Sequence, residues 1–465
     1  TGYVREQVRH EDKDYLRLKE TRIRINGQQS GLGVSIADVA HVRDIFLDES
    51  YRMEKGRQAF YDTCYENTQQ LIEQFQELDG QEFKETLANF YTALEEFMKD
   101  PVDSTNQSLM IQRADLFSWR CQSLYSDLQN YQSNINDQIK DDVARINEIG
   151  EAIYEINLHV QRIESANVET AMELRDQRDN LLDELAGYGR IEVTEDTTGF
   201  VFVDFEGQRF VDDYRANVID MKVDKGTGFV TPYWRSLSDP DKEDYTEVFR
   251  LDVDIDPDYH NDLGTTKARL INRGPGYGRY ADLEEENYPR VEDCVVMETE
   301  AELDKLYHTM VTQINDLLYP NTDAKDAAGN AIQIQAISAD GTLAFDASGA
   351  AVMVTVPDTY NGVPVNKVYD SMNASYGSDG KLPPPELFAR MGTERYSAIE
   401  VGQDAAGNPL YVYMYNEEDQ ENSNSLYTIG NVQVNPLLIK DYTKIPSYID
   451  NPTQAEDPEV DMAKI

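Results

Sequence analysis

Apolar residues recur about every 3.5 positions between residues 124 and 163, which is the period of a helical seam and not of a strand. The positions are Leu124, Leu128, Tyr131, Ile135, Ile139, Val143, Ile146, Ile149, Ile153, Ile156, Val160 and Ile163. Charged and amide residues occupy the other side of the same stretch: Asp127, Gln129, Asn134, Asp137, Lys140, Asp141 and Arg145. The pattern predicts one long amphipathic helix. Because such a helix is stabilised mainly by packing of its apolar stripe, we expect other helices to lie beside it.

Two further stretches with helical spacing, 39–78 and 81–99, are the candidates for that packing. Pro101 should end the second of them, because proline lacks the backbone N–H that a continuing helix needs. Ser104 or Thr105 is then expected to cap a third helix that begins near Asn106. The helical region as a whole runs to about residue 186.

The first 36 residues have a different pattern. Apolar and polar residues alternate over 15–25, which is typical of a strand, and 31–36 reads as a short turn and a second strand. The helical region is therefore expected to begin only after short N-terminal strands.

The pattern changes again after Gly189. Residues 191–195 and 200–205 alternate around the turn 196–199, which predicts a hairpin. The stretch 196–293 is rich in Asp, Gly, Pro and Tyr, and 298–319 returns to helical spacing before Pro320. A second β-rich region contains Asp-Ala-Ala-Gly-Asn twice, at 326–330 and 404–408, which we interpret as two similar turns.

Together these patterns predict an α+β multidomain protein, with an elongated, coiled-coil-like α-helical bundle domain followed by β-rich outer domains. We expect the following boundaries: 1–195, a helical domain with short N-terminal strands; 196–324, a β-rich domain with a helix near 298–319; 325–434, a second β-rich domain or insertion; and 435–465, a return linker in which a C-terminal helix begins at Glu459.

Charge narrows the classes of partner. The chain of 465 residues has 42 Lys and Arg against 87 Asp and Glu, a net charge of −45. Such a charge repels phosphate backbones and anionic membrane surfaces, so we expect no nucleic-acid partner. No apolar run approaches the roughly 18 residues of a membrane helix, and no apolar signal sequence opens the chain, so we expect no membrane insertion. Both ends read as cuts through a longer protein, because the chain starts without Met and stops within 455–465.

The sequence contains none of the common motifs for catalysis or metal binding. The cysteines Cys64, Cys121 and Cys294 form no C-x-x-C pair, and the five histidines form no H-E-x-x-H. Alternating acids at 252–258 resemble the start of a calcium loop, but Pro257 and Leu263 stand where such a loop needs Gly and Glu. No G-x-S-x-G or phosphate-binding loop is present. We therefore expect no catalytic residue, no metal ligand, no cofactor and no enzymatic activity.

The segment 174–185, Leu-Arg-Asp-Gln-Arg-Asp-Asn-Leu-Leu-Asp-Glu-Leu, leads directly into the predicted hairpin. Helical spacing places Leu174, Leu181 and Leu185 on one face, and Arg175 and Asp179 are i,i+4 partners. The arginines and aspartates are expected either to face solvent or to form a network against neighbouring backbone. We interpret the segment as a helix terminus that locks onto the hairpin, with a contact between subunits as the alternative.

The sequence of this segment, together with Ile-Glu-Val-Thr-Glu-Asp at 191–196, resembles the corresponding sequence of the hook-associated protein 1 (FlgK) family of the bacterial flagellum. Three other stretches resemble the same family: Thr-Gly-Tyr-Val-Arg-Glu-Gln-Val at 1–8, Gly-Leu-Gly-Val at 31–34 with Arg-Asp-Ile-Phe-Leu at 43–47, and Tyr-Thr-Ile-Gly-Asn-Val-Gln-Val-Asn-Pro at 427–436. The resemblance covers about 1–200 and 427–445. The Asn that opens the family's N-terminal pattern is absent before Thr1.

The resemblance implies a structural subunit outside the cell, exported by the flagellar type III route without a cleaved signal peptide. Its partners would be identical copies in a ring, the hook protein, and hook-associated protein 3, between which it would act as an adaptor. Both terminal polymerisation segments of the family look missing. The segments that carry the resemblance give the candidate assembly or domain-junction residues: Arg43, Asp44, Phe46, Leu174, Arg175, Asp176, Arg178, Asp179, Leu181 and Leu185.

Two alternatives stay open. Another flagellar axial protein, such as the hook protein or hook-associated protein 3, shares parts of the N-terminal pattern, although the hook protein lacks so long a helical region before its β domains. A secreted carbohydrate- or protein-binding protein is the second alternative, with a site in 196–434, where tyrosines such as Tyr411, Tyr413 and Tyr415 are frequent. Alternating tyrosines are more often the packed face of a strand.

Overall fold

The computed structural model describes residues 15–25, 28–40, 45–75, 83–165 and 171–461, with only the backbone described for 15–40. The chain divides into two compact units. Unit 1 comprises Thr1–Leu71, Asn130–Tyr277 and Glu292–Met297, and unit 2 comprises Ile72–Gln129, Gly278–Val291 and Glu298–Ile465. A long helical region followed by β-rich regions confirms the predicted α+β class.

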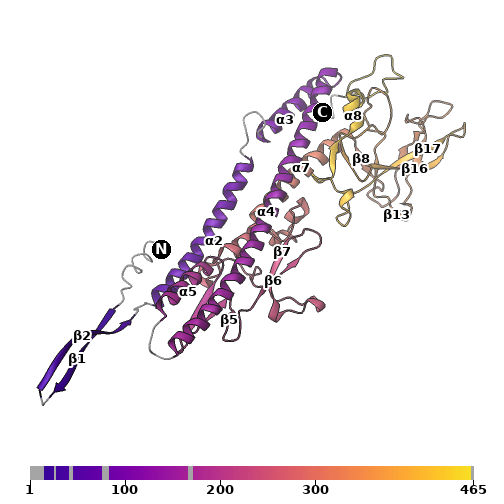
Figure 1. Ribbon diagram of the computed structural model, residues 1–465. Coiled ribbons are helices and arrows are strands. Elements are labelled where there is room, and N and C mark those ends of the chain that lie inside the picture. The colour runs from indigo at the N-terminus through magenta and orange to yellow at the C-terminus, as the bar shows by residue number, and fades with distance from the viewer. Residues whose placement is uncertain (1–14, 26–27, 41–44, 76–82, 166–170, 462–465) are drawn as a thin grey trace. The chain divides into compact units, whose positions relative to one another are not determined.

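The main helices are α2 (Ile45–Phe75), α3 (Phe83–Lys99), α4 (Ser104–Glu164), α5 (Met172–Leu185), α6 (Thr265–Arg273) and α7 (Val295–Leu318), with a short α8 (Pro436–Lys440) (Figure 1). Helix α4 is 61 residues long, so it extends well before the expected stripe. Helices α2, α4 and α7 each contribute residues to both units. The stretch expected to be helical from residue 39 begins instead at Ile45, because Val39 and Ala40 belong to a strand.

The cap of α4 also differs from the expectation. The carboxylate of Asp103 accepts hydrogen bonds from the backbone N–H groups of Thr105 at 2.6 Å and Asn106 at 3.2 Å. Asp103 therefore satisfies the first amides of the helix, whereas Ser104 and Thr105 were the expected caps. An aspartate is as good an N-cap as serine, and its negative charge also interacts favourably with the helix dipole.

Unit 1 combines helices with three small antiparallel sheets. Strands β1 (Tyr15–Ile25) and β2 (Gln28–Ala40) form a hairpin. Strands β3 (Ile191–Glu195), β4 (Val201–Phe205) and β5 (Gln208–Val211) form the second sheet in that order, and β6 (Ile219–Val223) pairs with β7 (Val230–Trp234). The predicted hairpin at 191–205 is thus β3–β4, with Ile191 opposite Phe205.

The apolar stripe of α4 is buried at most of its positions, but strands as well as helices contact it. Ile139, Ile146 and Ile153 are fully buried, whereas Ile163 is 38% exposed. At Gly150 the ring of Phe210, from β5, lies where a Cβ atom would stand, so a glycine permits close contact between helix and sheet. The sequence led us to expect other helices beside this helix and did not indicate that a sheet contacts it as well. Strands and helices can both bury an apolar face, and the period of the stripe does not distinguish them.

Unit 2 contains the second β-rich region. Its largest sheet consists of β8 (Asn321–Asp323), β10 (Ile337–Ser338), β14 (Lys367–Tyr369), β16 (Tyr396–Gln403) and β17 (Pro409–Tyr415). Two-stranded sheets join β9 (Gln333–Gln335) to β11 (Met353–Thr355), β12 (Thr359–Tyr360) to β13 (Val363–Pro364), and β15 (Phe388–Arg390) to β18 (Val432–Val434). In the helical part, Phe90 of α3 stacks on Phe117 of α4, and Phe117 stacks on Tyr307 of α7.

In the described part of the chain, turns of one geometry recur in four places, of which the sequence indicated three and missed the one at Asp346. In each, an aspartate side chain accepts hydrogen bonds from the amides two and four residues later, and the glycine three residues later has positive φ. The turns begin at Asp196, Asp326, Asp346 and Asp404. The aspartate replaces backbone partners within the turn, and glycine adopts positive φ without a steric penalty.

Residues 459–461 lie where we expected a helix to begin. Val460 instead forms an isolated antiparallel bridge with Tyr448, and the Asp461 amide donates to the Ser447 carbonyl at 3.0 Å. The backbone groups of this segment are thus paired with a neighbouring strand-like segment and not within a helical turn. Residues 462–465 lie outside the described part of the chain.

Candidate functional site at the α5 junction

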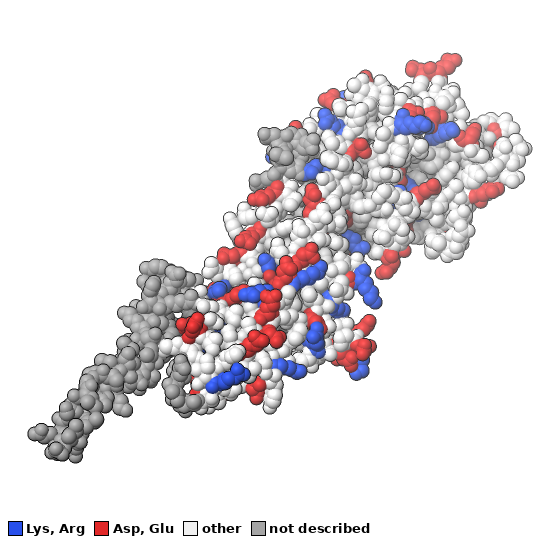
Figure 2. Space-filling model, viewed as in Figure 1, with Lys and Arg blue, Asp and Glu red and all other residues white. Residues whose placement is uncertain are grey.

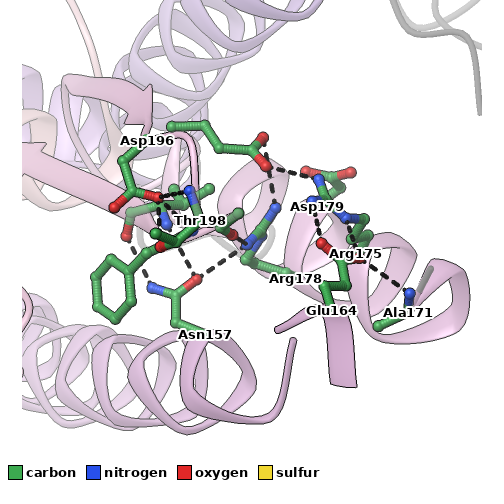
Figure 3. Close-up of polar contacts among 12 residues, drawn as sticks. Asn157, Glu164, Ala171, Arg175, Arg178, Asp179, Asp196 and Thr198 are labelled. Atoms are coloured by element: carbon green, nitrogen blue, oxygen red, sulfur yellow. Dashed lines mark hydrogen bonds and ion pairs between the residues drawn. The ribbon is translucent and has the colours of Figure 1, made fainter. Parts of the chain in front are cut away.

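Helix α5 directs its most buried polar side chain, Arg178, toward the hairpin β3–β4 and toward α4 (Figure 3). One guanidinium nitrogen of Arg178 donates to Oδ1 of Asn157 at 3.0 Å and to the Gly199 carbonyl at 2.8 Å. The carboxylate of Glu195, at the end of β3, lies 3.7 Å from the other. A single arginine therefore joins α5, α4 and the turn of the hairpin.

Burial lowers the pKa of Arg178 to about 10, although the charge of Glu195 partly opposes the change. The guanidinium thus stays charged at neutral pH despite having only 2% of its surface exposed. A charged donor forms stronger hydrogen bonds to carbonyl and amide oxygens than a neutral one. The position consequently favours arginine over any uncharged side chain.

Arg175, one turn earlier, pairs with two carboxylates nearer the surface. Its guanidinium forms a two-point contact with Glu164 at 2.9 and 2.7 Å and a hydrogen bond to Glu195 at 2.6 Å. The hydrogen bond from Arg175 is the main reason why the pKa of Glu164 lies below its usual value. Glu164 also accepts from the Ala171 amide at 3.0 Å, so the end of α4 supplies the start of α5 with a cap that Ala171 itself lacks.

The turn at 196–199 fits closely against this pair. Gly199 has a φ of +83°, and a Cβ atom there would lie 2.8 Å from Arg175 Nη2 and 2.9 Å from Glu164 Oε2. Both the backbone conformation and the space therefore require glycine at this position. The turn is held from within by Asp196, whose carboxylate accepts from the Thr198 amide at 2.8 Å.

A third arginine connects α5 to α2. Arg52 donates to Asp183 at 3.0 Å and lies 3.5 Å from Asp179. Arg52 and Asp183 are both buried, and burial lowers the pKa of Arg52 while the charge of Asp183 opposes that change. A buried charge is costly unless it is paired. The contact therefore determines which residue of α5 lies opposite Arg52 more than it adds to the free energy of folding.

Asparagines on one face of α4 hold the strands of unit 1 in place, and sequence reasoning did not identify them. The side-chain amide of Asn157 pairs with both backbone groups of Val201, and that of Asn147 with both of Ile219. Asn136 accepts from the Val230 amide at 2.9 Å. Spacings of eleven and ten residues place the three on one face, which is a signal the sequence contains. Isolated asparagines beside an apolar stripe are otherwise easily read as surface residues.

The candidate residues from the sequence are placed as follows. Leu185 is buried, Leu174 and Leu181 are half-buried, Asp176 is exposed, and Phe46 is 72% exposed. The expected common face of Leu174, Leu181 and Leu185 is not the most buried one, which instead carries Arg178, Leu182 and Leu185. Arg43 and Asp44 lie outside the described residues.

The expected i,i+4 pair is replaced by longer-range contacts: Arg175 pairs with Glu164 and Glu195, and Asp179 with Arg52. A neighbouring element can offer better geometry than the helix's own next turn, where exposed pairs contribute only a few tenths of a kcal/mol.

Unit 2 contains a second polar cluster, along one face of α7. Glu300 accepts from the Gly278 amide at 2.7 Å, and Asp304 accepts from the Tyr280 amide at 3.1 Å and the Ile429 amide at 2.8 Å. His308, one turn further, lies 2.9 Å from Glu418. Burial raises the pKa of Glu300 to about 8 and also raises that of Asp304. The side chains at 300, 304 and 308 thus fasten two loops to the helix.

On the face shown in Figure 2, Lys and Arg side chains are interspersed with Asp and Glu and do not gather into a basic patch. Among the described residues, no group of three or more His, Cys, Asp or Glu is arranged to hold a metal ion. No helix in that part of the chain has an apolar stretch long enough to cross a bilayer. The described tyrosines of β17, Tyr411, Tyr413 and Tyr415, are half-buried.

Comparison with known proteins gives three findings. Residues 68–246, which include α5 and the hairpin β3–β4 but not Arg52, match the family model described as the flagellar hook-associated protein FlgK helical domain. Flagellar hook-associated protein 1 of Bacillus subtilis (strain 168) is 26% identical over 198 residues, or 43% of this chain and 39% of that protein. The aligned part is therefore well under half of that relative. The flagellar hook junction protein FlgK from Burkholderia pseudomallei aligns with a TM-score of 0.49 at 14% identity, covering 86% of this chain and 66% of that one.

Proposed function

We propose that this FlgK-like flagellar hook-associated protein is a structural subunit of the junction between flagellar hook and filament. The observation that carries the proposal is the family match over 68–246, which spans all of α3, α4 and α5 and the strands β3 to β7. In this proposal the protein is extracellular, is exported by the flagellar type III route, and has no catalytic activity. Its partners are identical copies in a ring, the hook protein, and hook-associated protein 3.

The α5 junction suits a subunit that transmits mechanical load. Arg178 and Arg175 connect the end of α4, helix α5 and the hairpin through charged hydrogen bonds, and Arg52 adds α2. Side chains held at several points resist relative motion of the elements that carry them better than single contacts do. We therefore assign Arg175, Arg178 and Asp179 to an internal domain junction, in which they stiffen the subunit, and not to a contact between subunits.

Deletion of the gene, followed by electron microscopy of the cells, tests the proposed function. We expect hooks without filaments and flagellin in the culture medium, because filament growth needs a junction on the hook. Complementation with the wild-type gene serves as the control. Cells that keep normal filaments after the deletion would contradict the junction role. A missing hook would point to the hook protein instead.

A further inference from the structure

Strand β3 is an outer strand of its sheet, because the strand order is β3–β4–β5. The Glu206 amide donates to the Arg190 carbonyl at 2.9 Å, and this bond sets the alternation of hydrogen bonds between β3 and β4. Backbone groups of even-numbered residues of β3 point toward β4, and those of odd-numbered residues point away from it. The N–H and C=O groups of Ile191 and Val193 therefore lie on the free edge of the sheet. Within the described part of the chain, no hydrogen bond reaches these four groups.

The free edge of β3 borders a groove of about 350 Å³ within unit 1. Every residue from 189 to 194 lines this groove. Successive residues of a strand point to opposite faces, so an unbroken run of lining residues means that the edge of β3 meets the groove. The opposite wall is one face of α2, formed by Glu49, Arg52, Met53 and Gly56. The edge groups of Ile191 and Val193 are therefore next to open space.

The groove also has an apolar part. The side chains of Ile191 and Val193 are half-buried and share a face of the sheet with Phe205, which is fully buried and lies directly opposite Ile191. Met53 and Leu263 add further apolar surface to the lining. A strand added at this edge would place every second side chain on the same apolar face and would cover the two half-buried side chains. The groove therefore favours a chain that alternates apolar and polar residues.

The charged groups of the lining, taken with the groups that contact them, are mostly acidic. His260 lines the groove and lies 3.4 Å from Arg57, and Glu49 lines it as well. Three arginines stand in or beside the groove, each with its own carboxylate partners: Arg52 with Asp179 and Asp183, Arg57 with Glu54 and Asp262, and Arg190 with Glu192. With Glu49, six carboxylates surround three guanidinium groups. This balance attracts a basic segment and repels an acidic one.

We propose that the groove beside β3 binds an extended, basic segment of a partner protein, which joins the sheet as a fourth strand. The N–H and C=O groups of Ile191 and Val193 supply the hydrogen bonds, as in other complexes in which a peptide extends a sheet at its edge. Apolar side chains of the segment cover the half-buried face, and its lysine or arginine side chains lie near Glu49 and Glu192. Carboxylates along the edge keep strands of like charge from pairing there.

Hydrogen–deuterium exchange with a synthetic peptide tests the pairing directly. The probe is an eight-residue peptide that alternates valine and lysine and is blocked at both ends, and its binding is followed by fluorescence anisotropy. We expect saturating peptide to slow exchange of the Ile191 and Val193 amides about tenfold or more, because both gain acceptors. The Glu192 and Thr194 amides, which already point toward β4, should change less. A peptide that does not bind, or that binds without protecting the amides at 191 and 193, would overturn the proposal.

Two control peptides separate backbone pairing from other attractions. The same peptide with a methyl group on every second backbone nitrogen keeps its charge and side chains but cannot donate along one edge, and we expect it to bind about tenfold or more weakly. Equal binding would show that the groove recognises side chains alone. A peptide that alternates valine and glutamate should also bind about tenfold or more weakly, because the groove is acidic. Equal binding of that peptide would contradict a basic partner.

Val193→Pro removes one edge N–H without removing a hydrogen bond between β3 and β4, so the chain should fold and bind the lysine peptide about tenfold or more weakly. Val223→Pro is the matched control. Val223 is exposed on β6 of unit 1, and its N–H also points away from the partner strand, because the Asp224 amide donates to the Phe229 carbonyl at 2.9 Å. Equal loss of binding in the two variants would overturn the proposal. If Val193→Pro fails to fold by circular dichroism, exchange in the wild-type chain and the methylated peptide decide the question.

The occupant could also be a second copy of this chain, and the same measurement distinguishes that case. Protection of the Ile191 and Val193 amides that develops without peptide, as the chain is concentrated, would identify a second copy and overturn the proposal. The proposal does not rest on the junction role. Failed peptide binding together with a filament-less deletion strain would leave that role intact, and normal filaments with clear peptide binding would do the reverse.

Discussion

The α5 junction in unit 1 and the polar face of α7 in unit 2 bury charge in opposite ways. Where the junction meets the hairpin, the buried group is a cation, Arg178, and its anionic partner Glu195 lies near the surface with 39% of its side chain exposed. On α7 the buried groups are carboxyls, Glu300 and Asp304, which accept backbone N–H groups. Both arrangements fasten loops to a helix, but through groups of opposite charge.

The difference lies in what burial does to each kind of group. Burial lowers the pKa of a guanidinium from a value so high that Arg178, at about 10, remains charged at neutral pH. The same effect raises the pKa of Glu300 to about 8, so this carboxyl is mostly protonated at neutral pH. A buried arginine thus forms a permanent connection, whereas a buried carboxyl forms one that responds to pH.

The largest expected effect comes from Arg178→Ala. The substitution leaves Asn157 and the Gly199 carbonyl without their buried donor, and we expect a loss of about 3–5 kcal/mol in the stability of unit 1. Urea unfolding in a Trp119→Phe background checks this, because Trp234 of unit 1 is then the sole tryptophan. Asp176→Ala, on the exposed face of the same helix, is the matched control. An unchanged midpoint for Arg178→Ala would mean that the junction contributes nothing.

A smaller effect is expected from Asn157→Ala. Its amide is fully buried and pairs with both backbone groups of Val201, so truncation should cost about 1–3 kcal/mol. Asn134→Ala, at an exposed position of the same helix, should stay within about 0.5 kcal/mol. The same tryptophan-based unfolding measurement applies. Equal costs at the two positions would remove the distinction between the asparagines that hold strands and those that face solvent.

The sharpest contrast between the two regions concerns pH. Glu300 has a raised pKa in the folded state, so unit 2 binds more protons folded than unfolded. Its stability should therefore fall as pH rises from about 4.5 to about 8, by at most ~1.4 kcal/mol per pH unit. The pKa of Glu164 is lower in the folded than in the unfolded state. Its contribution to the stability of unit 1 is therefore present above the unfolded pKa and is lost as pH falls through the folded pKa.

Glu300→Gln should therefore flatten the pH dependence of unit 2 above about pH 5, and Glu164→Gln should reduce only the acid loss of unit 1. Hydrogen exchange of the Gly278 amide reports the first, and that of the Ala171 amide the second, because each donates to the carboxyl in question. The loss of stability caused by Glu164→Gln should be small, about 0.5–1 kcal/mol, because the ion pair of Glu164 with Arg175 is partly exposed. If Glu164→Gln changed the pH dependence of Ala171 protection above pH 6, the assignment of the acid loss to Glu164 would be contradicted.

Much of the fold could be predicted because its signals are local. The 3.5-residue period of α4, the alternation of β3 and β4, the helix at 298–319 and the Asp-Ala-Ala-Gly-Asn turns each follow from residues close together in the chain. The candidate site was predictable to the extent that 174–185 forms a helix leading into a hairpin. Its charged residues were visible, but their partners at 52, 164 and 195 were not.

By itself, the sequence determined where helices, strands and tight turns form, because side-chain period and backbone preference act over a few residues. Only the tertiary structure decided what covers the α4 stripe, which carboxylates pair with Arg175, and why Asn136, Asn147 and Asn157 stand where they do. These outcomes depend on groups that are far apart in sequence and meet only after folding. A buried donor or acceptor takes whichever partner the packed neighbours supply, and no local pattern records that choice.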